Sequence, residues 1–306
     1  MSYKCAECSE GFASQKSLHA HIKKHGMLLG DYYVKNFPRF NKLTKTQLPF
    51  KNVTDYFAKD FLNHNQLLKW CAAASQEEVK EYILQKLKER VEEKNYEVAP
   101  STVELFVSEL PTMDIYKTHF GSYKEACNLC GVKPMFGKNW PTDTRKDCQN
   151  VKIYIDSREQ KPLSFKNSEI MKLDVGDYSV GRDLYAHTHV DRKSFGDLCS
   201  TVTVGRERFE RELQRAADLG IYVFVVAETN LYSIKDTNYF SPKRYNLDYV
   251  FHNLKEIQHK FYKNCQFVFS GNRSNSATLI PILLVNGPKL WEVDIQYFVD
   301  KGEVFE

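Results

Sequence analysis

The sequence lacks the long apolar stretch and the leader that would take the protein to a membrane or out of the cell. No apolar run approaches the roughly 18 residues that a transmembrane helix needs, so we predict no membrane-spanning helix. The N-terminus is polar and contains cysteines, unlike a secretory signal peptide. We therefore expect a soluble, intracellular protein in the cytoplasm, or in the host cytoplasm if its source is viral.

A strong net charge is also missing, since the formal charge of the 306 residues is only +4. Residues 1–26 contain four basic and two acidic residues, residues 27–150 contain eighteen and sixteen, and residues 151–306 contain twenty-one of each. A contact with nucleic acid must therefore depend on local basic patches and not on bulk charge. The length allows two or three domains, each with its own hydrophobic core.

Disulfides are not expected, although the sequence has eight cysteines. Cys5 and Cys8 form a Cys-x2-Cys pair, and after twelve intervening residues His21 and His25 form a His-x3-His pair. This is the ligand spacing of a ββα zinc finger, in which a hairpin presents two thiolates and a helix presents two imidazoles. The pattern predicts one structural zinc ion in a reducing compartment.

The same segment also contains the small core that a zinc finger requires. Phe12 and Leu18 supply its apolar contacts, and the whole of residues 1–26 resembles the two-Cys, two-His finger family. Such a finger can dock on DNA, or it can contact RNA or protein. We expect an auxiliary DNA contact by Lys16, Lys23 and Lys24.

The next hundred residues are expected to be mostly helical. Residues 27–75 form an aromatic-rich connecting segment with a helix near residues 53–70 and no evident chemistry. Residues 76–94 have an amphipathic helical pattern, residues 101–110 predict a second helix that ends at Pro111, and residues 119–132 predict a turn and a third helix. Residues 135–150 follow directly on Pro134 and contain another proline, a glycine and several charges, and we expect a linker there.

Residues 76–134 resemble a known DNA-binding module, the homing-endonuclease-associated repeat. The resemblance implies one small helical repeat that contacts DNA. Cys127 and Cys130 form a second Cys-x2-Cys pair, but no further ligand pair follows, so we expect buried thiols. The residues that carry the resemblance are Pro100, Ser101, Tyr116, Phe120, Gly121, Ser122, Tyr123, Ala126 and Gly131.

Residues 151–306 alternate between β-rich and helical patterns. Strands are expected at 151–156, 184–191, 222–228 and 265–271, with helices at 205–220 and 247–261. The apolar run at 276–285 fits either a helix or a strand. The alternation predicts an α/β domain with a mixed central sheet.

Two acids and a lysine in this domain have a spacing that suits phosphodiester chemistry. Asp177 precedes Asp191 by fourteen residues, and a strand, a turn and a second strand can bring them side by side. Lys193 follows Asp191 at the period of a strand, so both point to the same face. Two carboxylates can hold a divalent cation, and the ammonium can orient a water or stabilise developing charge.

The surrounding motifs resemble the nuclease domain of the XPF/Hef structure-specific endonucleases, especially the short phage-type versions, within the PD-(D/E)xK superfamily. The motifs are IDSRE, VGDYSV, VDRKSFGDL and GRERFERELQRA, within residues 151–229. The resemblance implies a restriction-endonuclease-like fold and a Mg²⁺ or Mn²⁺ site at Asp177 and Asp191, with Lys193 as the catalytic lysine. It also implies supporting roles for Asp156, Arg158 and Asp197.

The sequence departs from the family pattern in two ways. Asp191 stands where the family has glutamate, one methylene longer. A tandem helix-hairpin-helix does not follow the nuclease motifs, so a homodimer is possible but not supported by that element. On the helix after the site, Arg208, Arg211 and Arg215 form a row that can contact DNA phosphates or pair with glutamates of the same helix.

These patterns together predict a metal-dependent DNA endonuclease, which its N-terminal modules place on DNA. A homing-type or mobile-element endonuclease is an alternative, because of the repeat resemblance. An alternative of another class is a non-catalytic DNA-binding regulator with a nuclease-like fold.

Overall fold

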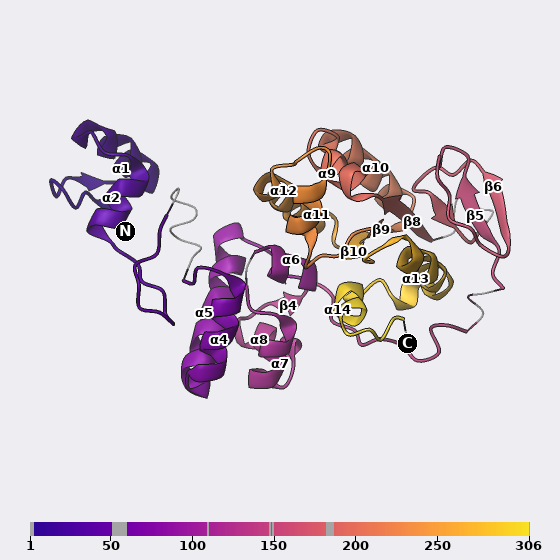
Figure 1. Ribbon diagram of the computed structural model, residues 1–306, viewed down its shortest axis with the longest axis horizontal. Helices are drawn as coiled ribbons and strands as arrows, with labels where there is room; N and C mark the ends of the chain where they lie inside the picture. The colour runs from indigo at the N-terminus through magenta and orange to yellow at the C-terminus, as the bar shows by residue number, and fades with distance from the viewer. Residues whose placement is uncertain are drawn as a thin grey trace. The chain divides into compact units, whose positions relative to one another are not determined.

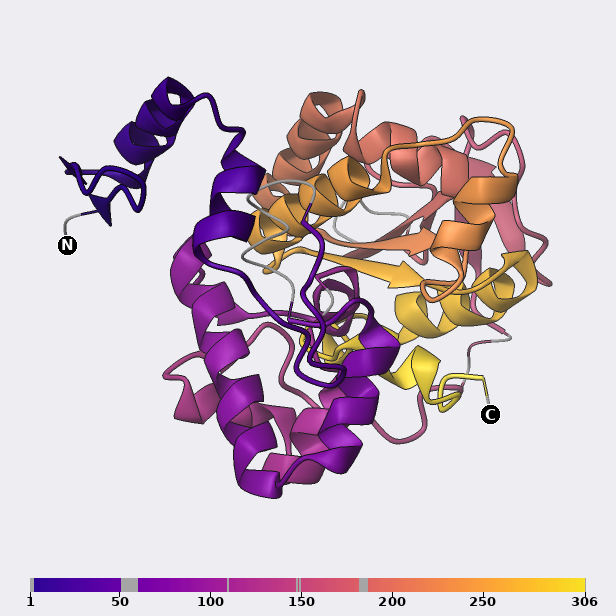
Figure 2. The ribbon, with the colours of Figure 1, turned by 60° about the vertical axis from the view of Figure 1, so that its left-hand side comes forward.

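The computed structural model describes residues 3–50, 60–108, 110–146, 148, 150–181 and 187–305, except for the side chains of residues 93 and 94 (Figures 1 and 2). The chain divides into two compact units, Met1–Val79 and Lys80–Glu306. The finer five-part division of the sequence stays a prediction. Among the described helices, none is long and apolar enough to cross a membrane.

The first unit begins with the predicted ββα arrangement. A hairpin pairs β1 (Tyr3–Lys4) with β2 (Gly11–Phe12), and the helix α1 (Gln15–Ile22) follows, continued by the 3-10 turn η1 (Lys23–His25). Ser14 caps α1 by accepting a hydrogen bond from the Ser17 amide. The helix expected near residues 53–70 falls partly on residues 51–59, outside the described residues, and α4 covers His64–Ala73.

A second helix, α2 (Leu29–Asn36), packs on the hairpin and α1. The Tyr32 hydroxyl accepts a hydrogen bond from the Ala6 amide at 2.8 Å, and the Tyr33 hydroxyl lies 2.8 Å from Nε2 of His19. Both tyrosines belong to one core with Cys5, Leu18 and Ile22. The sequence patterns did not predict α2, which enlarges a core that would otherwise be very small.

The helical region consists of α5 (Gln76–Lys94), α6 (Thr102–Val107), α7 (Met113–Phe120) and α8 (Tyr123–Leu129). The sequence predicted three of these helices and missed α7. Several residues of the predicted repeat hold the region together, since Ser101 caps α6, Ser122 caps α8 and the Tyr123 hydroxyl donates to the Pro100 carbonyl at 2.7 Å. Short parallel strands β3 (Val98–Ala99) and β4 (Lys133–Pro134) close it.

The C-terminal domain is built on a mixed sheet of six strands in the order β10-β9-β8-β7-β5-β6. Parallel pairs join β10 with β9, β9 with β8, and β5 with β6, whereas β7 runs antiparallel to both of its neighbours. The sequence prediction of a mixed α/β sheet is confirmed. The strands are β5 (Ile153–Asp156), β6 (Ser168–Met171), β7 (Tyr178–Ser179), β8 (Thr188–Lys193), β9 (Tyr222–Ala227) and β10 (Cys265–Phe269).

Helices cover both faces of this sheet (Figure 1). On one face, α9 (Phe195–Val202), α10 (Arg206–Asp218) and α12 (Leu247–Phe261) pack on the side chains of Val223, Val225 and Ala227. On the other face, α13 (Arg273–Asn286) and α14 (Ile295–Asp300) pack on Phe224 and Val226. The central strand β9 is therefore buried on both sides, as expected for a strand between two helical layers.

The segment that the sequence could not assign, 276–285, lies within α13. Asn272 caps this helix by accepting a hydrogen bond from the Asn275 amide at 2.9 Å. Its residues are buried almost all round, so the apolar pattern has no helical period, and Pro281 lies inside the helix. The cap, four residues before the ambiguous run, is the sequence signal that favours a helix.

The helical region is joined to the sheet domain by buried polar contacts. Glu104 of α6 is 1% exposed and contacts Arg90 of α5 and His259 of α12. The His259 ring also stacks on Tyr96, with the ring centroids 3.4 Å apart. Asp294 caps α14 and accepts a hydrogen bond from the Thr102 amide of α6 at 2.8 Å. Residues 80–305 therefore fold as one unit.

Asp294 makes the stability of this unit depend on pH. Burial raises the pKa of its carboxyl from about 3.8 to about 6. The unfolded chain therefore loses this proton at a lower pH than the folded chain, and stability falls as the pH rises from about 4 to about 6. Asp294→Asn keeps an acceptor oxygen but does not titrate. We expect its free energy of unfolding to increase by about 3 kcal/mol relative to that of the wild type over this pH interval. Urea unfolding at several pH values measures the difference, and a constant difference would contradict the prediction.

Candidate active site and metal-binding group

The structure brings Asp177 and Asp191 together on neighbouring strands. Tyr178 of β7 pairs with Val190 of β8, and the two strands are antiparallel. Asp177, the residue before Tyr178, therefore lies across from Asp191, the residue after Val190. A carboxylate oxygen of Asp177 accepts a hydrogen bond from the Arg192 amide at 2.8 Å, which fixes the side chain against β8. The predicted return of Asp177 to the side of Asp191 is what the structure shows.

Lys193 lies on the same face as the two acids. Its Nζ donates to Asp191 at 2.6 Å, and its side chain is 21% exposed. Burial alone would lower the pKa of the ammonium, but the negative charges of Asp191 and Asp177 outweigh burial and raise this pKa. Lys193 therefore stays protonated at neutral pH and can donate a hydrogen bond or balance negative charge.

The two acids repel each other more strongly than the lysine can offset. Burial and the repulsion of Asp191 together raise the pKa of Asp177 to about 8. Asp191 itself is 3% exposed. Carboxylate oxygens are the ligands that Mg²⁺ and Mn²⁺ prefer, and a cation placed between two such groups would relieve their repulsion. The residues present thus fit a divalent cation at Asp177 and Asp191.

Gly176 permits the close approach of the two strands. It has a φ of +67°, and a β-carbon there would lie 2.9 Å from the Val190 carbonyl oxygen. The Asp177 amide donates to that oxygen at 2.8 Å. Only glycine both adopts this left-handed backbone easily and leaves room for the Val190 carbonyl oxygen. The Gly-Asp pair of the motif therefore has a steric reason.

We expect Gly176→Ala to lower both stability and activity. The left-handed backbone costs about 1 kcal/mol for alanine, and the clash with Val190 adds to this cost and moves Asp177. Gly220→Ala is a matched control, because Gly220 has a φ of +69° but a β-carbon there would meet only open space. Denaturant unfolding and DNA cleavage distinguish the two variants, and equal losses would contradict the steric argument.

Asp156 and Arg158 form a separate support beside the acids. Arg158 Nε and Nη2 donate to the two Asp156 oxygens at 2.8 and 2.9 Å, and the Leu173 amide donates to Asp156 at 2.8 Å. Burial opposes ionisation of Asp156, but these hydrogen bonds outweigh burial and lower its pKa. The Asp156 amide donates to the Asp177 carbonyl at 2.8 Å. This pair thus holds the loop that leads to Asp177.

Asp197 lies apart from the acid pair, at the start of α9. It is exposed, and its carboxylate accepts a hydrogen bond from the Ser194 hydroxyl at 2.6 Å. The Ser194 oxygen in turn accepts from the Asp197 amide, which makes a reciprocal cap of the helix. In the part of the chain that the structure describes, Asp197 has no hydrogen bond to Asp177 or Asp191.

An acid of α10, Glu212, approaches the site from the helical layer. Its carboxylate accepts a hydrogen bond from the Gly176 amide at 3.5 Å, and its charge acts on both Lys193 and Arg158. The position of Glu212 beside the arginine row in the sequence makes it a candidate supporting acid, in addition to the predicted catalytic residues.

Arg192, the middle residue of the Asp-Arg-Lys motif, points to the opposite face of β8. It pairs with Glu159 at 3.1 Å and with Glu228 at 2.9 Å, and its side chain is 8% exposed. These contacts tie the β5–β6 connection to the end of β9. Sequence reasoning missed this network, because the partners lie 33 and 36 residues from Arg192.

One member of the arginine row of α10, Arg215, lies beside the site. Arg215 donates to the Asp174 carbonyl at 2.6 Å, which places it next to the loop before Gly176. The nearby Glu210 pairs with Arg206 and Lys260 instead of with Arg208 or Arg211. For Glu210, the structure therefore does not support the alternative in which the arginine row pairs with glutamates of its own helix.

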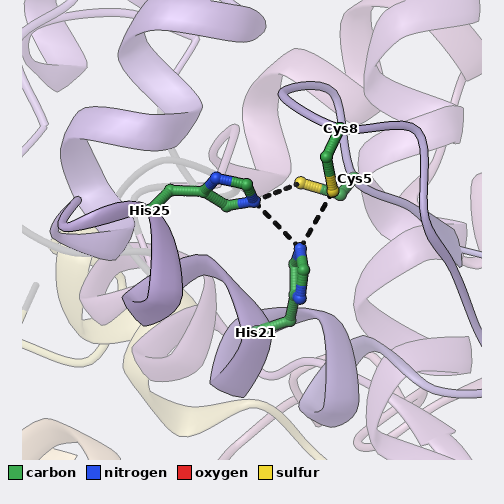
Figure 3. Close-up of side chains that lie close together, drawn as sticks. All are labelled: Cys5, Cys8, His21 and His25. Atoms are coloured by element: carbon green, nitrogen blue, oxygen red, sulfur yellow. Dashed lines mark hydrogen bonds between the residues drawn. The ribbon is translucent and has the colours of Figure 1, made fainter.

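The four predicted ligands of the finger converge in the first unit (Figure 3). Cys8 Sγ lies 3.1 Å from His21 Nε2, and Cys5 Sγ lies 3.6 Å from His25 Nε2. All four ligand atoms lie within 4.8 Å of one another. Ligands at 2.0–2.3 Å from a tetrahedral zinc are about 3.3–3.8 Å apart, so the group could bind zinc. In the described residues, it is the only such group of three or more.

Part of the C-terminal domain matches a known protein family. Residues 155–291, fewer than half of the 306, match the family model of the ERCC4 domain, so this part of the chain is an ERCC4/XPF-like nuclease domain. No curated protein matches the sequence significantly.

Two solved structures were also matched. XPF from Aeropyrum pernix in complex with DNA is 19% identical with a TM-score of 0.35, and the match covers 45% of this chain and 66% of that chain. A second structure of XPF from Aeropyrum pernix is 18% identical with a TM-score of 0.34, and the match covers 46% of this chain and 68% of that chain. The chain thus spans about two thirds of the length of these proteins.

Proposed function

We propose that the protein is a DNA endonuclease that depends on Mg²⁺ or Mn²⁺ and acts on branched or otherwise structured DNA. The single observation that supports this most is the packing of Asp177, Asp191 and Lys193 on one face within the ERCC4 domain. The cation, bound by Asp177 and Asp191, would neutralise phosphate charge and lower the pKa of a water.

The other side chains of the site orient and balance charge. The Lys193 ammonium, anchored on Asp191, can donate to a phosphate oxygen or to the attacking water. Asp156 and Arg158 fix the loop before Asp177, and 63% of the Arg158 side chain remains exposed for a phosphate contact. Asp197 is proposed as a supporting acid that acts from the exposed start of α9.

The N-terminal modules would hold the protein on DNA without reading a sequence. In a DNA-docking finger, helix positions −1, 3 and 6 contact bases. Because α1 begins at Gln15, these positions are Ser14, Ser17 and Ala20, and the two serine hydroxyls bond to each other at 2.9 Å. Alanine has no hydrogen-bonding group, so base readout would be poor.

Phosphate contacts remain available to the finger. Lys16, Lys23 and Lys24 lie on α1 and η1, and zinc at the four ligands would hold these two elements in place. The helical region is proposed as a homing-endonuclease-associated repeat that adds a further DNA contact. Arg208, Arg211 and Arg215 are proposed to bind phosphates near the active site.

A cleavage assay tests the proposal. The protein is incubated with duplex, flap and branched DNA and with Mg²⁺ or Mn²⁺, and compared with Asp177→Asn. Asp174→Asn is the matched control, because Asp174 is exposed, three residues from Asp177, and makes its contact through the backbone. We expect cleavage by the wild type and the control only. No cleavage by the wild type would favour the DNA-binding regulator.

A further inference from the structure

One exposed surface of the nuclease domain takes no part in the proposed active site. It lies at the end of α11 (Ile234–Phe240) and in the connection to α12, and we name its side chains Tyr239, Phe240, Lys243 and Arg244 the aromatic platform. Phe240 is 81% exposed and Tyr239 is 61% exposed. Two adjacent aromatic rings in water favour a partner that covers them.

The platform combines these rings with positive charge. The rings of Tyr239 and Phe240 meet edge to face, with centroids 5.1 Å apart. The Arg244 guanidinium lies 4.6 Å from the centre of the Tyr239 ring, and Lys243 Nζ lies 5.0 Å from that of Tyr245. Neither cation forms an ion pair with a described residue. Both can therefore bind an external anion.

Hydrogen bonds hold the connection that supports the platform. The Asn238 side chain both donates to the Tyr245 carbonyl at 3.0 Å and accepts from the Tyr245 amide at 2.9 Å. At the other end, Asn246 caps α12 by accepting a hydrogen bond from the Tyr249 amide. A partner thus meets a preorganised surface and loses less entropy on binding.

The platform also lies next to the strand end that contains Lys193. The Tyr245 hydroxyl donates to the Gly196 carbonyl at 3.3 Å, and its ring packs on Phe195 with the centroids 5.8 Å apart. Gly196 is three residues after Lys193, at the start of α9. DNA that enters the active site can therefore extend over this surface.

We propose that the aromatic platform binds an unpaired DNA strand next to the cleavage site. This inference rests on the proposed endonuclease function and adds the kind of substrate that the site prefers. Exposed bases can stack on Tyr239 and Phe240, whereas a duplex hides its base faces. Lys243 and Arg244 supply the phosphate contacts, and their charge favours a polyanion over a second copy of the chain.

Binding without cleavage tests the proposal directly. Fluorescence anisotropy is measured on the full zinc-loaded chain, without Mg²⁺, with a labelled oligothymidine and with a blunt duplex. We expect the double variant Tyr239→Ala/Phe240→Ala to lose roughly tenfold or more in affinity for oligothymidine and less than about twofold for the duplex. Ile170→Ala is the control, since Ile170 is 68% exposed on the edge strand β6.

Each result has a defined meaning. Unchanged oligothymidine affinity in the double variant overturns the proposal. The proposal is also overturned if sedimentation shows that the wild type is a dimer and the double variant is a monomer, with no loss of oligothymidine binding. The surface would then serve a second copy of the chain. If the wild type binds oligothymidine through the platform but cleaves no DNA, the endonuclease function fails and the platform stands. If the wild type cleaves DNA and the double variant binds normally, only the platform fails.

Discussion

Asp191→Asn is expected to reduce metal-dependent cleavage by a factor on the order of a thousand, equal to about 4 kcal/mol of transition-state stabilisation. Asparagine keeps the shape of the side chain but removes the charge that would bind the cation and that anchors Lys193 at 2.6 Å. Single-turnover cleavage at saturating Mg²⁺ measures the loss. Circular dichroism of the same samples shows whether the fold is retained.

Asp191→Glu tests whether the length of the side chain matters at this position, because the family that the motifs resemble has glutamate there. Asp191 is 3% exposed and held by Lys193, so the longer side chain must displace the lysine or the strand. We expect an intermediate loss of activity and a changed ratio of Mn²⁺ to Mg²⁺ rates. Activity equal to that of the wild type would show that the site tolerates either acid, and our argument from side-chain length would be wrong.

Local patterns were sufficient to predict much of the C-terminal domain. The helix expected at 247–261 is α12, with the same limits, because its capping residue and its apolar period are both local. The mixed sheet followed from the alternation of elements. Asp177, Asp191 and Lys193 could be placed on one face because strand period and a glycine turn are also local properties.

The remaining features depend on contacts between residues that are far apart in the sequence. The interactions of Glu104 with Arg90 and His259 span 14 and 155 residues, and no local pattern predicts them. Helix α7 has a cap without a side-chain hydrogen bond, so its start had no clear signal. The role of Asp197 is hard to predict for a different reason. The motif gives its position, but many helix starts share the kind of hydrogen bond that it forms with Ser194.

Removal of zinc is expected to unfold residues 3–37 while leaving residues 80–305 folded. Four ligands and a core of five buried residues hold this segment, and Cys5 belongs to both groups. Without the ion the buried Cys5 thiol and the buried His21 imidazole gain no compensating bonds, and small finger modules seldom fold in that state. Cys8→Ser should lose zinc, measured by mass spectrometry, and the amide signals of α1 and α2. Cys71→Ser, outside the ligand group, should keep both.

We expect the proposed contribution of the finger to DNA binding to be separable from its folding. Replacement of Lys16, Lys23 and Lys24 by glutamine should keep zinc and structure, because all three side chains lie outside the ligand group and the core. If each lysine binds one phosphate, the slope of log affinity against log salt concentration becomes shallower by about three. Cys8→Ser should show the same change in slope, because its unfolded segment no longer presents the lysines together. A loss of affinity in Cys8→Ser with an unchanged slope would mean that the finger acts through contacts other than these lysines.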